Sequence, residues 1–142
     1  MTQKEFDAKM TEIREIYNNR AHDLRAALTP KITELETKQL AVKEEYEKVN
    51  LKLREEYAEL VYKENELRRK GYAHYSEEVE AVRRQKDDNK LRQKGLTFDF
   101  QNKMHALKLE WKKANTELTQ ALQSNNAMRN KAKREVAAQM QS

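Results

Sequence analysis

Histidines are the first candidates for metal chemistry in this sequence, which has three of them, at His22, His74 and His105. Two ligands on one helical face need a spacing of three or four residues, as in His-x-x-x-His or Glu-x-x-His. His22 and His105 have no such partner, and the chain has no cysteine. The sequence therefore predicts no metal ligand, no disulfide bond and no thiolate chemistry.

Nucleophilic and phosphate-binding motifs are the next candidates for chemistry. The serines are Ser76, Ser124 and Ser142, and none lies in the Gly-x-Ser-x-Gly pattern that exposes a nucleophile on a sharp turn. Gly71 and Gly95 stand alone, so there is no glycine-rich loop to hold a phosphate. Carboxylate pairs are abundant, but catalytic pairs need a pocket that shifts their pKa, and thin helical arms offer none. We therefore expect no enzymatic activity, no catalytic residue and no cofactor.

Clustered basic residues are the strongest polar signal in the second half of the chain. Segment 83–94 provides six candidate phosphate contacts, and these are Arg83, Arg84, Lys86, Lys90, Arg92 and Lys94. Segment 129–134 adds Arg129, Lys131, Lys133 and Arg134. Such cations would bind a nucleic-acid backbone without reading its sequence, and the binding would weaken with salt. They would equally form a solvated helix face, and no zinc-finger, RNP or helix-turn-helix pattern accompanies them.

The composition indicates which elements must position these residues. Charged and hydrophobic residues each make up 37% of the 142 residues, with only two glycines and one proline. Turns need Gly, Pro and Asn, so this composition disfavours a β protein and favours long helices in a coiled coil. No apolar run is long enough to cross a membrane, and the N-terminal residues lack the apolar core of a signal peptide. We therefore expect a cytoplasmic protein.

An apolar stripe runs along residues 3–70, the first expected helical arm. From Phe6 to Leu35 its spacing repeats every eleven residues, close to the period of a straight helix. Beyond Leu35 the spacing approaches a heptad, with the polar residues Gln39 and Glu64 at two of its positions. Pro30 lies inside the stripe, and because the stripe crosses it without a change of phase, we expect a kink there rather than a turn. The stripe comprises Phe6, Met10, Ile13, Tyr17, Ala21, Leu24, Leu28, Ile32, Leu35, Val42, Tyr46, Val49, Leu53, Tyr57, Leu60 and Leu67.

A turn is expected over residues 71–76. Gly71 follows three basic residues, and glycine is the preferred residue just past a helix end that carries such cations. Ser76 is followed by two glutamates, which is the pattern of a helix N-cap with acids in the first turn. One arm therefore ends near residue 70, and another begins near residue 77.

The second expected arm, residues 77–140, has a weaker apolar stripe than the first. Few apolar residues precede Phe100, and Gly95 is unfavourable in a helix interior. We expect a break near Gly95 and a new helix start capped by Thr97. From Phe100 the stripe returns at Met104, Leu107, Trp111, Ala114, Leu118, Leu122, Met128, Ala132, Val136 and Met140.

The two arms have nearly equal lengths, which favours an antiparallel hairpin. Residues 1–67 hold 12 Lys/Arg against 15 Asp/Glu, whereas residues 68–142 hold 17 against 9, so the arms also attract each other. The predicted fold is all-α, a long helical hairpin or coiled coil in one domain over residues 1–142, closed within one chain or between two. The expected pairs are Phe6 with Met140, Met10 with Val136, Leu24 with Leu122, Leu28 with Leu118, Ile32 with Ala114, Leu35 with Trp111, Val42 with Met104 and Tyr46 with Phe100.

One segment of this pairing is mismatched, because apolar residues of the first arm face polar residues of the second. The apolar residues are Val49, Leu53, Tyr57 and Leu60, and they face approximately Thr97, Gln93, Asn89 and Lys86. Apolar surface without an apolar partner usually marks an interface. We therefore predict that residues 46–67 bind a protein partner, in the first instance a second copy of the chain.

The sequence thus favours a non-enzymatic coiled-coil protein that forms a homo-oligomer and acts in assembly or as a scaffold. One alternative is a non-specific nucleic-acid-binding protein that uses segments 83–94 and 129–134. Another is a chaperone-like helical clamp, which would hold non-native proteins along an open apolar seam. A gel-shift titration across salt tests the nucleic-acid alternative, since the absence of a shift at low salt removes it.

Overall fold

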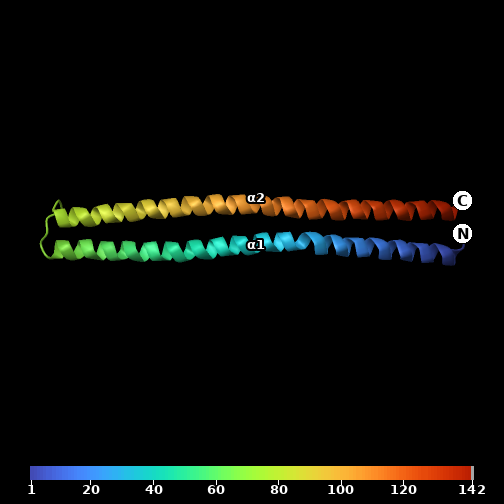
Figure 1. The fold of residues 1–142 in the computed structure, drawn as a ribbon, viewed down its shortest axis with the longest axis horizontal. Helices are drawn as coiled ribbons and strands as arrows, with labels where there is room; N and C mark the ends of the chain where they lie inside the picture. The colour runs from blue at the N-terminus through green and yellow to red at the C-terminus, as the bar shows by residue number, and fades with distance from the viewer. Residues whose placement is uncertain (142) are drawn as a thin grey trace. The chain divides into compact units, whose positions relative to one another are not determined.

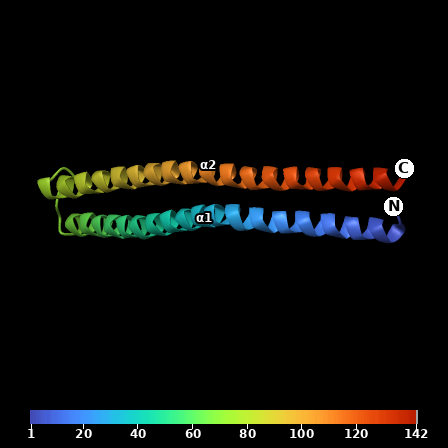
Figure 2. The same cartoon turned by 45° about the vertical axis from the view of Figure 1, so that its right-hand side comes forward.

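Two long helices make up the computed structural model, which describes residues 1–141 (Figure 1). Helix α1 spans Gln3–Arg69 and helix α2 spans Glu77–Gln141. They pack against each other as an antiparallel hairpin, and the two views show the ribbons side by side (Figures 1 and 2). No strand occurs among the described residues. The predicted all-α hairpin is confirmed, with helix ends within one residue of those expected.

Both helices begin at a side-chain cap. The Thr2 hydroxyl accepts a hydrogen bond from Glu5 N at 3.2 Å and caps α1. The Ser76 hydroxyl accepts one from Val79 N at 3.4 Å and caps α2, while the Ser76 carbonyl accepts from Glu80 N at 2.9 Å. These oxygens satisfy backbone donors that have no partner within the first turn of a helix. The predicted cap at Ser76 is therefore confirmed.

Gly71 ends α1 and begins the turn. Its φ of 95° lies in the left-handed region, which a residue with a Cβ adopts only with strain. Gly71 N donates to Arg68 O at 3.0 Å, and Tyr72 N donates to Leu67 O at 3.1 Å. This is the Schellman pattern, which satisfies the last carbonyl groups of a helix. The turn predicted after the basic residues 68–70 is confirmed.

The contacts of the hairpin gather into two units. The terminal unit comprises residues 1–36 and 109–141, and the turn unit comprises residues 37–108. Each unit holds one stretch of α1 packed antiparallel against one stretch of α2. The expected organisation as a single domain stays a prediction.

Few apolar residues are buried in either unit. They are Ile32, Leu35 and Val136 in the terminal unit, and Val79 and Val82 in the turn unit. The other positions of the predicted α1 stripe are half-buried, as a thin seam between two helices requires. Gln39 and Glu64 also lie in this seam, at the polar positions that the spacing predicted.

The register of the pairing agrees with the sequence where side chains meet across the hairpin. In the turn unit, the rings of Tyr46 and Phe100 stack with centroids 4.2 Å apart and 16° between their planes. In the terminal unit, Trp111 Nε1 donates to Glu36 Oε1 at 3.2 Å, next to Leu35, the residue predicted to face Trp111. The predicted pairing of Tyr46 with Phe100 is therefore confirmed.

Met128 departs from the predicted α2 stripe, because it is 49% exposed. The seam there is occupied by Asn125, which is buried, and by Arg129, which is half-buried. Asn125 Nδ2 donates to the carbonyl oxygen of Tyr17 at 3.0 Å. A polar side chain that reaches the backbone of the facing helix thus takes the place of the apolar one that the spacing predicted.

Gly95 does not break α2, and the expected restart at Thr97 is wrong. Helix α2 runs through both residues without interruption. The Thr97 hydroxyl donates to Gln93 O at 3.0 Å instead of capping a new first turn. A glycine inside a helix costs only about 1 kcal/mol relative to alanine. The helical turns on either side of Gly95 pack in the seam and form cooperatively, so the backbone stays helical at Gly95.

Pro30 also lies inside a continuous helix, since α1 passes through it. No turn forms there, in agreement with the unbroken phase of the stripe. Leu28 and Ile32 lie in the seam on either side of the proline. Their packing against α2 offsets the backbone hydrogen bond that the pyrrolidine ring removes. The kink itself stays a prediction.

Candidate interaction surface

The segment with the predicted mismatch lies on the inner face of the turn unit. The four candidate interface residues of α1 are all half-buried there, and they are Val49, Leu53, Tyr57 and Leu60. Lys86, Asn89, Gln93 and Thr97 are buried or half-buried on α2, and we call them the polar seam. The two helices therefore meet here through one apolar and one polar face.

A continuous run of hydrogen bonds joins the polar seam to α1. Thr97 Oγ1 donates to Gln93 O, so it accepts from the Tyr46 hydroxyl at 3.1 Å. Gln93 Nε2 donates to Asn89 Oδ1 at 2.6 Å, and Asn89 Nδ2 donates to Leu53 O at 3.0 Å. Both ends of the buried Asn89 amide are thus satisfied. Such contacts fix the register of two helices but stabilise them less than apolar packing does.

Glu64 is a buried carboxylate at the end of the polar seam nearest the turn. Its side chain is 8% exposed and lies 2.8 Å from Lys86 Nζ, 3.1 Å from Arg83 Nε and 3.1 Å from Arg68 Nη2. The hydrogen bond from Lys86 is the main cause that lowers the pKa of Glu64, burial opposes it, and Arg83 and Arg68 add to the lowering. The carboxylate therefore stays ionised and ties α1 to α2 beside the turn.

His74 extends the Glu64 cluster into the turn. Arg83 Nη2 lies 2.5 Å from His74 Nδ1 and 2.9 Å from Nε2, and Arg68 Nη2 lies 3.0 Å from Nδ1. A guanidinium group only donates hydrogen bonds, so the imidazole accepts through one of its two ring nitrogens. The ring therefore positions two arginines that also bind Glu64.

The candidate phosphate contacts of segment 83–94 are partly engaged within the chain. Arg83 and Lys86 bind Glu64, Lys86 and Lys90 lie 5.7 and 5.3 Å from the centre of the Tyr57 ring, and Arg92 pairs with Asp88 at 3.1 Å. Arg84 and Lys94 are exposed. The positive charge that this segment offers to a polyanion is thus smaller than its composition suggests.

The basic residues of segment 129–134 are divided between the seam and the surface. Arg129 and Lys133 are half-buried, whereas Lys131 and Arg134 are exposed. Arg129 Nε is buried and has no hydrogen-bond partner among the residues that the structure describes. These cations therefore do not form one continuous exposed patch.

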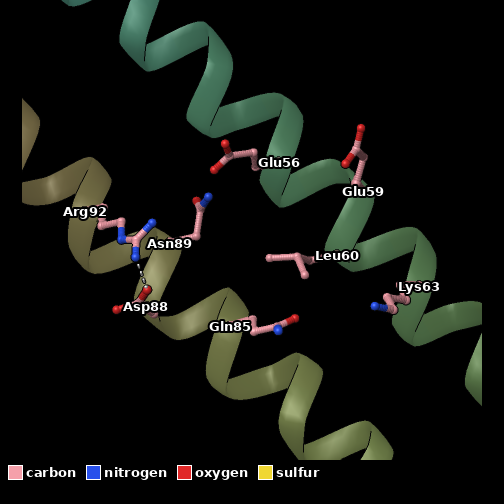
Figure 3. Close-up of a pocket in the computed structure, with 8 residues that line it drawn as sticks. All are labelled: Glu56, Glu59, Leu60, Lys63, Gln85, Asp88, Asn89 and Arg92. Atoms are coloured by element: carbon pink, nitrogen blue, oxygen red, sulfur yellow. Dashed lines mark ion pairs between the residues drawn. The ribbon is translucent and has the colours of Figure 1, made fainter.

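A shallow groove of about 390 Å³ opens between the helices of the turn unit (Figure 3). Leu60 points into it from α1, and Gln85 faces it from α2. Charges of both signs surround these two side chains, and the ion pair between Arg92 and Asp88 lies on the α2 rim. Leu60 is thus the candidate interface residue that lines an open space.

Large apolar side chains that were not predicted as contact residues are also exposed on the outer faces of both helices in the turn unit. On α1 they are Leu40, Leu51 and Tyr62, exposed by 57%, 59% and 66%. On α2 they are Leu91 and Phe98, exposed by 66% and 63%. We call these two groups the α1 outer stripe and the α2 outer stripe.

The α1 outer stripe leaves a signal in the sequence, because Leu40, Leu51 and Tyr62 are spaced by eleven residues. Eleven residues complete three helical turns, so these side chains share one face. The inner stripe of the same helix has more members and dominates the apolar pattern, so the outer stripe is easily missed in the sequence. The exposed fractions of their side chains distinguish the two faces of the helix.

Among residues 1–141, no three His, Cys, Asp or Glu side chains lie close enough together to hold a metal ion. No helix within that range is both long and apolar enough to span a membrane.

Comparison with known proteins identifies no relative of this chain. No family model, no curated protein and no solved structure matches the chain. Its function is therefore argued from its own surfaces.

Proposed function

We propose that this chain is a non-enzymatic coiled-coil protein that self-assembles and serves as a scaffold. The observation that carries the proposal is the amount of surface that the chain leaves exposed, together with the large apolar side chains on it. The chain exposes 10749 Å², whereas a compact monomer of its mass exposes about 7,700 Å². Among residues 1–141, only five apolar residues are buried. A partner that covers apolar side chains supplies the burial that the hairpin lacks.

The proposed contact surface is the segment 46–67 of α1. Val49, Leu53, Tyr57 and Leu60 meet polar residues across the hairpin, so part of their apolar surface has no apolar partner. Leu60 borders the groove and is directly accessible there. In the same segment, Leu51 and Tyr62 point outward and enlarge the apolar surface that a second chain would cover.

Sedimentation velocity of the full chain at increasing concentration tests self-assembly. We expect a mass above the 16.9 kDa of one chain that rises with concentration. A monomer at every concentration would overturn the proposal.

The double variant Leu53→Asp/Leu60→Asp tests the segment, and we expect it to sediment as a smaller species. Circular dichroism of the same sample checks that the helices persist, because both residues also pack in the hairpin. An unchanged mass removes the inner face of residues 46–67, formed by Val49, Leu53, Tyr57 and Leu60, as the self-association face.

A polyanion is the competing partner. Glu64 and Asp88 already pair with Arg83, Lys86 and Arg92, which weakens the electrostatic attraction of segment 83–94 for phosphates. A gel-shift titration with duplex DNA and RNA, started at low salt, distinguishes nucleic-acid binding from self-assembly. Retention that falls steeply with salt would favour nucleic-acid binding, and no retention leaves self-assembly.

A chaperone-like clamp would instead suppress the aggregation of an unfolded client protein at stoichiometric concentration.

A further inference from the structure

The two outer stripes of the turn unit point away from the helix interface. Leu51 lies two residues from Val49 and from Leu53, both of which are in the seam, and Leu91 is placed in the same way between Asn89 and Gln93. Two residues correspond to roughly 200° around an α-helix, so each outer side chain points away from the partner helix. The turn unit thus has an apolar stripe on each of two opposite sides.

We propose that the outer face of α1 in one copy of the chain docks against the outer face of α2 in a second copy, within the turn unit. The helices run antiparallel in this contact, with Leu51 against Phe98 of the second copy and Ala58 against Leu91 of the second copy. This inference rests on the self-assembly proposed above and names the surfaces that produce it.

The spacing of the apolar residues supports this register. Leu51 and Ala58 are seven residues apart on α1, and Leu91 and Phe98 are seven residues apart on α2. Two antiparallel helices with the same seven-residue spacing bring both apolar pairs into contact at once. Ala58 is exposed and small, so it leaves room for the Leu91 side chain of the second copy.

Charge complementarity supports the same register independently. Between the two apolar pairs, Glu55 faces Lys94 of the second copy, and just beyond them Glu59 faces Lys90 of the second copy. All four charged side chains are exposed in the single chain, and Lys90 also lies 5.3 Å from the centre of the Tyr57 ring. Opposite charges at facing positions of paired helices favour one partner and one orientation.

Two symmetric contacts, α1 against α1 and α2 against α2, fit the apolar and charged residues less well than α1 against α2 does. If two α1 outer faces met about Leu51, Glu47 of each copy would face Glu55 of the other, and like charges at such positions destabilise the contact. If two α2 outer faces met, Leu91 and Phe98 would be covered, but Leu51 and Tyr62 of both copies would stay in water. Docking of α1 on α2 covers both stripes and pairs opposite charges.

Charge exchange provides the first test, by sedimentation velocity of the full chain. Glu55→Lys or Lys94→Glu alone replaces an attraction by a repulsion, and we expect each to lower the association constant about tenfold. The double variant Glu55→Lys/Lys94→Glu restores the opposite signs, so its association constant should return to within about threefold of the original. Glu12→Lys, an exposed change in the terminal unit, is the matched control and should have no effect.

Disulfide trapping provides the second test, since the chain has no cysteine of its own. A mixture of Leu51→Cys chains and Phe98→Cys chains should form a mixed disulfide on oxidation, and neither variant alone should dimerise covalently. Preferential 51–51 or 98–98 disulfides, or charge variants that leave the association constant unchanged, would overturn this docking mode while the proposed self-assembly stands. An unmodified chain that sediments only as a monomer overturns the proposed function itself.

Discussion

Asn89 Nδ2 donates a hydrogen bond to the carbonyl oxygen of Leu53 on the facing helix, at 3.0 Å. Asn125 makes the same contact with the carbonyl oxygen of Tyr17 in the terminal unit, also at 3.0 Å. Each unit therefore contains a buried asparagine of α2 that binds the backbone of α1. A helix carbonyl retains a lone pair after its own backbone hydrogen bond, so these contacts satisfy the asparagines without disturbing α1.

Replacement of Asn125 should reveal the contribution of this contact. Asn125→Ala removes the donor to Tyr17 and leaves a small gap in the seam, so we expect the free energy of unfolding to fall by about 1–2 kcal/mol. Asn126 is exposed one position further along, and Asn126→Ala should change stability by less than about 0.5 kcal/mol. Urea denaturation of both variants measures the difference. Equal effects at the two positions would show that Asn125 contributes only its helix propensity.

Glu64 should make the stability of the turn unit depend on pH. Its pKa is lowered in the folded chain, chiefly by Lys86, so the ionised carboxylate stabilises the fold above the ordinary glutamate pKa of about 4.3. That contribution is lost as the pH falls through the lowered pKa. We expect Glu64→Gln to cost about 1–2 kcal/mol near neutral pH and progressively less in acid.

The control for Glu64 is Glu66→Gln. Glu66 is more exposed and forms an ion pair with Arg69 at 2.9 Å within α1, so its loss should cost less than about 0.5 kcal/mol. Thermal unfolding from neutral pH down to about pH 3 follows both variants. A constant difference between Glu64→Gln and the unmodified chain across this range would contradict the prediction.

The two glycines should respond in opposite ways to alanine. Gly71 has a φ of 95°, so Gly71→Ala introduces strain at the end of α1 and should destabilise the fold by about 1 kcal/mol. Gly95 lies inside α2, and a Cβ there would meet nothing within 4 Å. Gly95→Ala should therefore stabilise α2 by about 0.5–1 kcal/mol. A lower melting temperature for Gly95→Ala would contradict the continuous course of α2 through Gly95, and a higher one for Gly71→Ala would contradict the strain at Gly71.

The stacked rings of Tyr46 and Phe100 should be energetically coupled. A double-mutant cycle with Tyr46→Leu and Phe100→Leu, measured by chemical denaturation, is expected to give a coupling energy of about 0.5–1.5 kcal/mol. Tyr46→Phe keeps the stacking and removes only the hydroxyl that donates to Thr97, so it should cost about 1 kcal/mol. Additive single effects would contradict the predicted register at this pair.

The fold was predictable because the spacing of apolar residues is a property of the chain alone. The stripe from Phe6 to Leu67 and the signals at Gly71 and Ser76 fix two helices and one turn. The break predicted at Gly95 is wrong because the free-energy cost of one glycine in a helix is local and small, whereas the surrounding helical turns form cooperatively. Propensity at one residue is a weak guide when tens of residues propagate the same structure.

The candidate surface was less predictable, because it depends on what individual side chains contact. The mismatch opposite Leu53 was visible, but the hydrogen-bonded run through Asn89, Gln93 and Thr97 that fills it was not. Likewise, the charge counts did not indicate that Glu64 already binds part of segment 83–94. Pairing of specific atoms follows from three-dimensional placement rather than from composition.

The short turn sets the order in which this hairpin closes. Glu64 and Arg83 are only 19 residues apart in the chain, whereas Tyr46 and Thr97 are separated by 51 residues and Tyr17 and Asn125 by 108. Closing a longer loop loses more chain entropy, and each contact formed near the turn shortens the loop for the next one. We therefore expect folding to proceed from Gly71 outward and unfolding to start by fraying at the two chain ends.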